Sequence, residues 1–272
     1  MTDEWLRKAT RPVRVTRIDA TAPNLARVWN YMVGGRDHFE ADRAAARELI
    51  AAAPVMADVA QASRAFLRRV VRFLAIEAGI RQFLDIGTGI PAAGSPHELA
   101  QAVDPASRIV YVDNDPVVLA HARALTLSRP EGAISCLQAD AREPAAIIDA
   151  ARRTLDLNQP VAVLLIGVLN FIEGPGLVAG VLRELVAALC PGSYLAIMQP
   201  AADKGLHPVQ RRWNELAALP VWLRDRAEVA SWFDGLSLVE PGIVEVHEWR
   251  PDEGGRAYRH GMPLYGAVGR KP

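Results

Sequence analysis

The feature that most constrains the fold is an alternation of short apolar runs with segments of helical period between residues 81 and 199. The apolar runs are rich in β-branched residues and comprise RQFLDIG, RIVYVDND, ISCLQAD, AVLLIGV and SYLAIMQ. The helical segments between them are Pro96–Val103, Pro116–Leu127, Pro144–Leu155 and Pro175–Leu189. Strands and helices that alternate in this way build a parallel sheet through right-handed crossovers. We therefore expect an open α/β fold with a mostly parallel sheet.

Three of the predicted strands end at an acidic residue, namely Asp85, Asp113 and Asp140. In open α/β sheets, ligands bind outside the carboxyl ends of the strands, near the point where the strand order reverses. The sequence therefore predicts that three carboxylates gather at one edge of the sheet and form part of a ligand site.

The chain outside this core is predicted to add helices before it and both helices and strands after it. Before the first strand we expect an arm without clear period, helices over Asn24–Tyr31, Asp42–Ala53 and Ala60–Ala78, and a turn at Gly34-Gly35. After the fifth strand we expect two helices, followed by the strands LSLVEPGIVEV and AYRHGMPLYGAVGR, paired antiparallel at the sheet edge. The result is one domain with four parts, residues 1–79, 80–200, 201–235 and 236–272.

The composition excludes several classes of function. The 31 basic and 31 acidic residues give a net charge of zero, and the basic N-terminal arm lacks interleaved aromatic residues, so nucleic-acid binding is not expected. The two cysteines show no metal spacing and no disulfide framework, which indicates a reducing, cytoplasmic location. We expect no secretory signal, since the N-terminal residues are acidic and then basic with no apolar stretch behind them, and the longest apolar run has 12 residues where a membrane span needs about 20. No His, Asp and Glu set has metal-ligand spacing.

The loop after the first strand, DIGTGIPAAG, raises the question of which ligand it binds. Gly87, Gly89 and Ala92 satisfy the G-x-G-x-x-A pattern of dinucleotide sites, which alone is a weak signal. However, the loop is long, and Asp85 precedes Gly87 by two residues. A carboxylate ~4 Å from a phosphate repels it by about 1 kcal/mol in water and about 4 kcal/mol near a protein surface. It attracts an ammonium or a sulfonium by a similar amount, which favours S-adenosylmethionine over a diphosphate.

The following motifs extend this site. Asp113 lies 26 residues after Gly87, where its carboxylate can accept both ribose hydroxyls of an adenosine cofactor. Asp140 lies where the adenine amino group would be, although it could instead cap the helix that begins near Pro144. Arg64 could reach the carboxylate of the cofactor. The predicted cofactor residues are Tyr31, Gly34, Gly35, Arg64, Asp85, Gly87, Thr88, Gly89, Asp113, Asn114, Asp140, Ala141 and Gly167.

These motifs carry a family resemblance. DIGTG, YVDNDP, QADARE and AVLLIGVLNFI resemble, in order and spacing, the successive motifs of class I S-adenosylmethionine-dependent methyltransferases. PNLARVWNYMVGGRDHFEADR, SRAFLRRVVRFLA and VEPGIVEVHEWRPD look like an actinomycete family of these enzymes whose substrates are mostly unassigned. That likeness runs from about Pro23 to Lys271.

The resemblance implies a Rossmann-like sheet of seven strands whose last strand is antiparallel. It also implies that the N-terminal helices form a lid, with Tyr31, Gly34 and Gly35 near the methionine end of S-adenosylmethionine. The acceptor is expected to be a small molecule. Three residues depart from what related sequences tend to have: His38 stands in place of Asn, Asn170 in place of His, and Gln199 in place of a Ser-His pair.

A catalytic base cannot be assigned from the sequence. Positioning alone can supply roughly 7–11 kcal/mol of a methyl transfer, so a base is needed only for a hydroxyl or a protonated amine. His38, Asp37 and His207 are the weak candidates; for His207 a solvated loop position is the simpler interpretation. The other four histidines are expected at surface or helix positions without partners.

Two alternatives to a methyltransferase stay open at this point. The changes at Asn170 and Gln199 are compatible with a protein that binds S-adenosylmethionine but has lost transfer or become regulatory. The glycine pattern alone would also suit an NAD(P)-dependent oxidoreductase. The long N-terminal helices leave a homodimer open as well.

Overall fold

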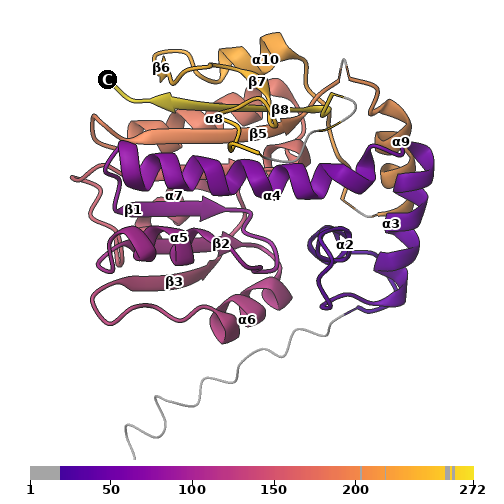
Figure 1. Cartoon of the computed structure of the whole chain (residues 1–272), viewed down its shortest axis with the longest axis horizontal. Coiled ribbons are helices and arrows are strands. Elements are labelled where there is room, and N and C mark those ends of the chain that lie inside the picture. The colour runs from indigo at the N-terminus through magenta and orange to yellow at the C-terminus, as the bar shows by residue number, and fades with distance from the viewer. Residues whose placement is uncertain (1–18, 203, 218, 255–257, 259–260) are drawn as a thin grey trace, which may run out of the picture.

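The computed structural model describes residues 19–202, 204–217, 219–254, 258 and 261–272. Within these residues the centre is one sheet with the strand order β3-β2-β1-β4-β5-β8-β6, and β7 also pairs with β8 (Figure 1). The strands are β1 Gln82–Ile86, β2 Arg108–Asp113, β3 Ala133–Gln138, β4 Ala162–Ile166, β5 Tyr194–Pro200, β6 Ser237–Leu238, β7 Val244–Glu245 and β8 Leu264–Arg270. The first five are parallel and β8 is antiparallel to β5, which confirms the predicted mixed α/β sheet.

The described sheet has eight strands, so the expected number of seven is wrong. The segment predicted as one strand, LSLVEPGIVEV, is interrupted and forms both β6 and β7, which pair antiparallel with β8. The interruption contains Pro241, which has no N–H to donate, and Gly242, whose φ of 84° lies in the left-handed region. Residues 257, 259 and 260 of the second predicted strand and residues 255 and 256 of the loop before it lie outside the described residues, as does most of the N-terminal arm.

The predicted helices are present, with shifted ends. They are α2 Leu25–Met32, α3 Glu40–Ala52, α4 Met56–Arg72, α5 Pro96–Val103, α6 Pro116–Leu125, α7 Pro144–Ala151, α8 Pro175–Ala187, α9 His207–Leu216 and α10 Arg226–Ser231. The four helices of the α/β core begin with proline at the first position, where the missing N–H costs no helical hydrogen bond. Asp115 caps α6, since its side chain accepts the Val117 N–H at 2.7 Å.

The core lies in two layers, one on each face of the sheet. Alternate strand residues point to opposite faces, so that Phe83 and Ile109 belong to one apolar cluster and Leu84 and Val110 to the other. Helix α4 covers the first face and α7 and α8 the second (Figure 1). Trp213, Trp232 and Trp249 are buried and belong to these two clusters.

Helices α2, α3 and α9 stand beside the edge at which the parallel strands end, on the right of Figure 1. We call this the carboxyl edge. Helix α3 packs against both α2 and α9, and Arg212 of α9 forms an ion pair with Glu48 of α3. These helices therefore close off the side of the sheet where a ligand would bind.

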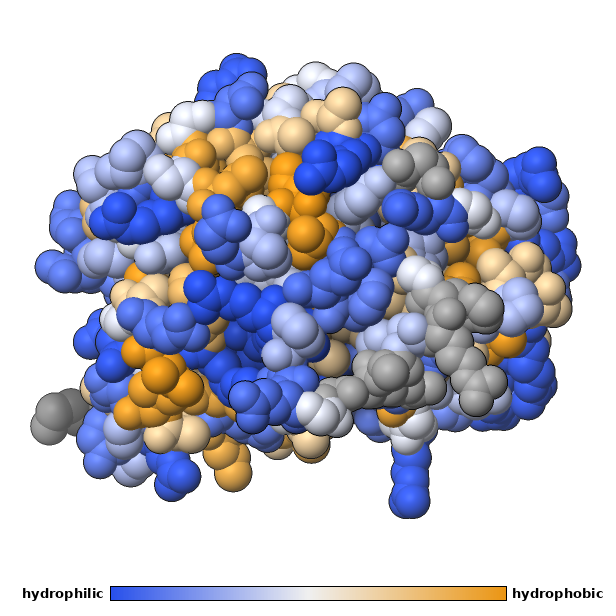
Figure 2. All heavy atoms as spheres, turned by 45° about the horizontal axis from the view of Figure 1, so that its top comes forward, coloured by the Kyte–Doolittle hydropathy of each residue, from blue (hydrophilic) through white to orange (hydrophobic). Residues whose placement is uncertain are grey.

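The surface in the view of Figure 2 is mainly hydrophilic, with hydrophobic side chains in a few separate patches. Such scattered exposed apolar groups are normal for a folded domain. Among the described residues, no helix combines the length and the apolar character that crossing a membrane requires.

Candidate functional site

A cavity of about 430 Å³ opens at the carboxyl edge. It is bounded by the ends of β1 to β5, by α4, and by residues of α2 and α9. A volume of this size is in the usual range for small-molecule sites, about 300–1,000 Å³. The prediction that the three strand-end acids gather at one edge is confirmed, because Asp85, Asp113 and Asp140 all line this cavity.

Ten of the thirteen predicted cofactor residues line the cavity, namely Arg64, Asp85, Gly87, Thr88, Gly89, Asp113, Asn114, Asp140, Ala141 and Gly167. Tyr31, Gly34 and Gly35 are not among its lining residues and lie at the end of α2 and in the turn after it. Their assignment to the methionine end stays a prediction.

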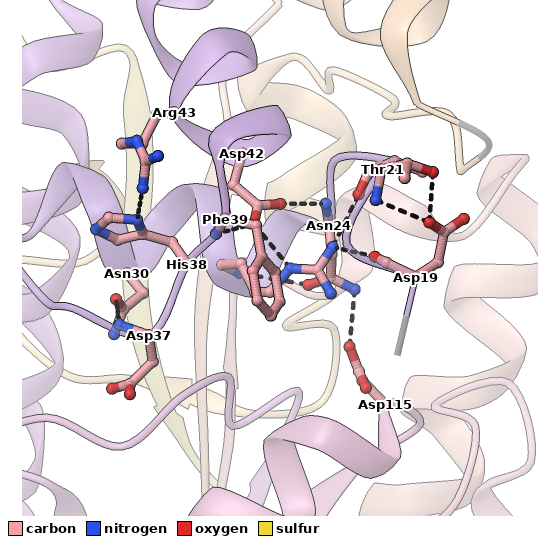
Figure 3. A network of polar contacts seen from close by, with 12 residues as sticks. Asp19, Thr21, Asn24, Asn30, Asp37, His38, Phe39, Asp42, Arg43 and Asp115 are labelled. Carbon is pink, nitrogen blue, oxygen red and sulfur yellow. Dashed lines mark hydrogen bonds and ion pairs between the residues drawn. The ribbon is translucent and has the colours of Figure 1, made fainter. Parts of the chain in front are cut away.

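The candidate bases also lie outside the lining of the cavity. His38 Nε2 is 3.1 Å from the Gly35 carbonyl oxygen, and its ring meets that of Tyr31 edge-on at 5.1 Å. Its Nδ1 is 3.2 Å from Arg43 Nη1 (Figure 3). His207 begins α9, with its Nδ1 3.4 Å from Gln210 Oε1. No described residue of the lining is a histidine, so neither imidazole is placed to take a proton there.

Histidines expected to lack partners have them. His97 is buried, and its Nδ1 lies 2.8 Å from Tyr111 Oη. His121 Nδ1 is 4.0 Å from an Asp37 oxygen, and His247 Nδ1 is 3.6 Å from Glu245. The contacts of His97 and His121 join separate segments of the chain, which is why the local pattern did not predict them, whereas His247 and Glu245 are only two residues apart. His260 lies outside the described residues.

The glycine loop is shaped by two left-handed residues. Gly87 has a φ of 77°, and a Cβ there would lie 2.6 Å from Val168 Cβ. Gly89 has a φ of 63°, and a Cβ there would meet no atom within 4 Å, so the space beside it is open. The Gly89 N–H donates to Asp113 Oδ2 at 3.0 Å. Asp113, at the end of β2, thus fixes the position of the glycine loop beside the cavity.

Asp85 is the most buried ionisable residue of the described lining, and Arg64 lies near enough to influence its charge. Burial raises the pKa of Asp85 to about 7, opposed by the nearby Arg64 guanidinium and by the Thr88 hydroxyl. Burial likewise lowers the pKa of Arg64, whose Nη2 donates to the Ile90 carbonyl at 2.8 Å. Because burial outweighs the attraction to Arg64, a cation from a ligand would stabilise the ionised form of Asp85.

The other two acids lie in different surroundings. Burial raises the pKa of Asp113, although its carboxylate accepts the backbone N–H groups of Asp115 and Gly89. Asp140 is more exposed, and hydrogen bonds from Arg142 lower its pKa. The alternative that Asp140 caps α7 is wrong, because the N-cap residue is Glu143 and Asp140 accepts the Arg142 N–H instead.

A polar network that the sequence did not reveal connects α2 to the core (Figure 3). Asn24 caps α2 through its Oδ1, and its Nδ2 donates to Asp115 Oδ2 at 2.8 Å. Asp42 accepts the Asn24 N–H and pairs with the buried Arg27 at 2.8 Å. An Asn before an apolar helix signals a cap, but nothing local indicates a partner 91 residues away.

The chain can be compared with known proteins. A family model described as S-adenosyl methyltransferase matches residues 12–272. A DUF574 family protein of Streptomyces avermitilis is 42% identical, with a TM-score of 0.90 over 94% of this chain and 100% of its own. A Thermobifida fusca protein, provisionally assigned as a methyltransferase, is 38% identical, with a TM-score of 0.85 over 93% and 96% of the two chains. None of the curated proteins matches.

More distant structures share the fold alone. The magnesium protoporphyrin IX methyltransferase of Synechocystis is 12% identical, with a TM-score of 0.52 over 90% of this chain and 93% of its own.

The residues at the carboxyl edge suit the cofactor of this family. Beside Gly89 there is room for a ligand to approach the backbone, and the buried Asp85 carboxyl favours a cation over a phosphate. The family match also removes the oxidoreductase alternative, which rested on the glycine pattern. The chain therefore belongs to the S-adenosyl methyltransferase family and is an S-adenosylmethionine-dependent methyltransferase.

Proposed function

We propose that the acidic carboxyl edge holds the methyl donor and that the acceptor is a small molecule. In this proposal Asp85 pairs with the amino group of the methionine end, Asp113 accepts the ribose hydroxyls, and Asp140 faces the adenine amino group. Gly87 and Gly89 let the backbone approach the donor. One observation carries the proposal: the three strand-end acids share a single cavity with the open face of Gly89.

The chemistry of the site supports this orientation of the donor. Asp85 is the most buried of the three acids, so water screens its attraction to a cation least. Asp113 uses one oxygen for Gly89 and the other for Asp115, and each carboxylate oxygen keeps a further lone pair for a hydroxyl. Charge-assisted bonds of this kind contribute about 1.5–3 kcal/mol each.

Methyl transfer in this site would proceed mainly through positioning. S-adenosylmethionine supplies a methyl group on a positively charged sulfur, which is already a good leaving group. The chain would bind the donor, orient the acceptor in line with that methyl group and exclude water. Such alignment can account for roughly 7–11 kcal/mol of the barrier.

A small acceptor is supported by the way in which helices enclose the cavity. Residues of α2, α4 and α9 all line it, and α3 ties α2 to α9. An enclosed site of about 430 Å³ suits a small molecule better than the surface of a macromolecule.

Calorimetry with S-adenosylhomocysteine tests the donor site. We expect micromolar binding to the wild type and loss of at least tenfold in affinity for Asp113→Asn, which preserves the shape of the side chain but removes its charge and one of the two oxygens that accept the Gly89 and Asp115 N–H groups. Asp104→Asn is the matched control, since Asp104 lies in a loop and pairs with Arg81 outside the cavity. Equal binding by wild type and Asp113→Asn would contradict the proposed ribose contact.

A further inference from the structure

The cavity has a second, apolar part beyond the acidic edge. We call it the acceptor compartment and define it by six lining residues, Met56, Val59, Phe171, Met198, Val209 and Trp213. They come from the first turn of α4, the turn after β4, the end of β5 and helix α9. Because β4 and β5 lie on the opposite side of β1 from β2 and β3, this compartment adjoins the donor side without overlapping the ribose and adenine acids.

Charged side chains are confined to the donor side. Among the described lining residues the charged ones are Arg64, Asp85, Asp113, Asp115, Asp140 and Arg142. Asp85, Asp113, Asp115 and Asp140 lie at or just after the ends of β1 to β3, and the two arginines interact with Asp85 and Asp140. A charged acceptor would therefore lack a counter-ion in the compartment and would lose its hydration on entering.

Two uncharged polar residues, Gln210 and Asn170, line the cavity beside this compartment, and Gln210 Nε2 already donates to the Val221 carbonyl oxygen. Asn170 lies in the short 3-10 turn Leu169–Phe171 that follows β4, and it is only 5% exposed. Its backbone carbonyl accepts the Trp222 N–H at 2.7 Å, which fixes the residue in place. Its side-chain Oδ1 is fully buried, and no described residue donates a hydrogen bond to it. Buried amide oxygens rarely lack a hydrogen-bond donor, so we expect a bound ligand to supply the donor for this oxygen.

We propose that the acceptor is an uncharged, mainly apolar ring compound with an N–H or O–H group that donates a hydrogen bond to Asn170 Oδ1. The inference rests on the donor site proposed above, because that site places the methyl group beside the compartment. Trp213 and Phe171 provide flat surfaces for a ring, and Met198 provides an adaptable thioether contact.

The lining also restricts the atom that is methylated. None of the described residues of the compartment can take a proton, so the acceptor atom must hold a free lone pair at neutral pH. That lone pair forms the new bond to the methyl carbon while the sulfur–carbon bond breaks and its electrons remain on sulfur. The positive charge passes from sulfur to the acceptor, which afterwards releases a proton to water if the methylated atom carries one.

Two matched probes test the hydrogen bond. Indole and benzofuran have nearly the same shape, but only indole has an N–H to donate. We would measure their binding to protein saturated with S-adenosylhomocysteine, by ligand-observed NMR and calorimetry, for the wild type, Asn170→Leu and Asn158→Leu. Asn158 is an exposed residue before β4 and serves as the control. Indole-3-acetate tests the exclusion of an anion.

We expect the wild type and Asn158→Leu to bind indole about five- to tenfold more tightly than benzofuran, the usual effect of one satisfied hydrogen bond. Asn170→Leu should lose that preference and still bind S-adenosylhomocysteine as the wild type does. The inference is overturned if benzofuran binds as tightly as indole, if indole-3-acetate binds more tightly, or if neither ring binds up to its solubility limit. Failure of S-adenosylhomocysteine itself to bind would instead contradict the proposed donor site.

Discussion

Asp85 is the residue on which the chemistry of the site depends most. It ends the first strand, is 4% exposed, and has a pKa of about 7 because burial disfavours its charge more than Arg64 favours it. The ligand-free protein therefore keeps a carboxyl group in surroundings that suit a neutral group. Active sites commonly retain such unfavourable groups because their ligands compensate for them.

The raised pKa of Asp85 predicts that Asp85→Asn stabilises the ligand-free protein. The pKa is higher in the folded than in the unfolded chain, so the wild type loses stability as the pH rises from about 4 through 7. The variant should gain little at pH 4, progressively more through pH 5 and 6, and about 2–4 kcal/mol at pH 8. Chemical denaturation across this pH range measures the gain.

The control for this prediction is Asp104, whose pKa is shifted in the opposite direction to that of Asp85. Hydrogen bonds from the Ala106 N–H and from Arg81 lower the pKa of Asp104, so Asp104→Asn should give no gain that grows with pH. If both variants behave alike, or if Asp85→Asn is less stable than the wild type at pH 8, burial is not the main influence on Asp85.

The same side chain predicts a pH dependence of binding. If the ammonium group of S-adenosylhomocysteine pairs with ionised Asp85, binding should tighten as the pH rises. The dissociation constant of S-adenosylhomocysteine should fall by up to about tenfold for each pH unit of increase up to pH 7 and then stay constant. Calorimetry from pH 5.5 to 8 measures this. Asp85→Asn should bind more weakly at neutral pH and show a flat profile, whereas a wild-type slope that survives the substitution would exclude Asp85 as its source.

Among the elements, the glycine loop contains one glycine that is needed for packing, Gly87, and one that we expect to be needed for binding, Gly89. A left-handed conformation costs a non-glycine residue roughly 1–2 kcal/mol. Gly87→Ala adds an overlap with Val168, whereas the side of Gly89 is open toward the cavity. We therefore expect Gly87→Ala to lower the free energy of unfolding by more than 2 kcal/mol and Gly89→Ala by about 1 kcal/mol.

Binding should distinguish the same two variants in another way. Gly89→Ala places a methyl group where the donor would approach the backbone, so S-adenosylhomocysteine should bind at least tenfold more weakly even though the protein is folded. Thermal denaturation and calorimetry on both variants provide the measurements. Undiminished affinity in Gly89→Ala would show that the donor does not approach this residue.

The contact between α2 and the core predicts how the site is closed. The Asn24–Asp115 hydrogen bond is the link at the cavity, and Asn24→Asp would replace its donor with a carboxylate facing another carboxylate. The variant still has an oxygen to cap α2, so the helix should persist while S-adenosylhomocysteine dissociates several-fold faster in stopped-flow experiments.

An exchange of the two side chains provides the control. Combining Asn24→Asp with Asp115→Asn restores one donor and one acceptor and keeps an oxygen at both helix caps. This double variant should recover most of the wild-type dissociation rate. If the single variant dissociates at the wild-type rate, α2 does not retain the ligand through this bond.

Local patterns were sufficient for most elements but not for their ends or for the edge of the sheet. Proline marks the start of α5 to α8, because its effect is confined to its own position and its neighbours. The end of α7 at Ala151 and the division between β6 and β7 were not predicted. The division has a local cause, because Pro241-Gly242 is a turn signal within the segment predicted as one strand, and both halves still pair with β8.

For the molecule as a whole, the clustering of the strand-end acids could be predicted and the apolar part of the cavity could not. Asp85, Asp113 and Asp140 were predicted to lie together because parallel strands end at the same edge, whatever covers that edge. The acceptor compartment is made by segments as distant in sequence as Met56 and Trp213. Met56 belongs to α4 and Trp213 to α9, and α3 contacts both helices, an arrangement that no local period encodes.

A crystal structure of the protein with S-adenosylhomocysteine would test the proposed donor site directly. We expect the nucleoside along the carboxyl edge, with its ammonium group at Asp85, both ribose hydroxyls at Asp113 and the adenine beside Asp140. The sulfur should point toward the compartment bounded by Phe171 and Trp213. A nucleoside bound elsewhere, or bound with its ribose away from Asp113, would contradict the proposed donor site.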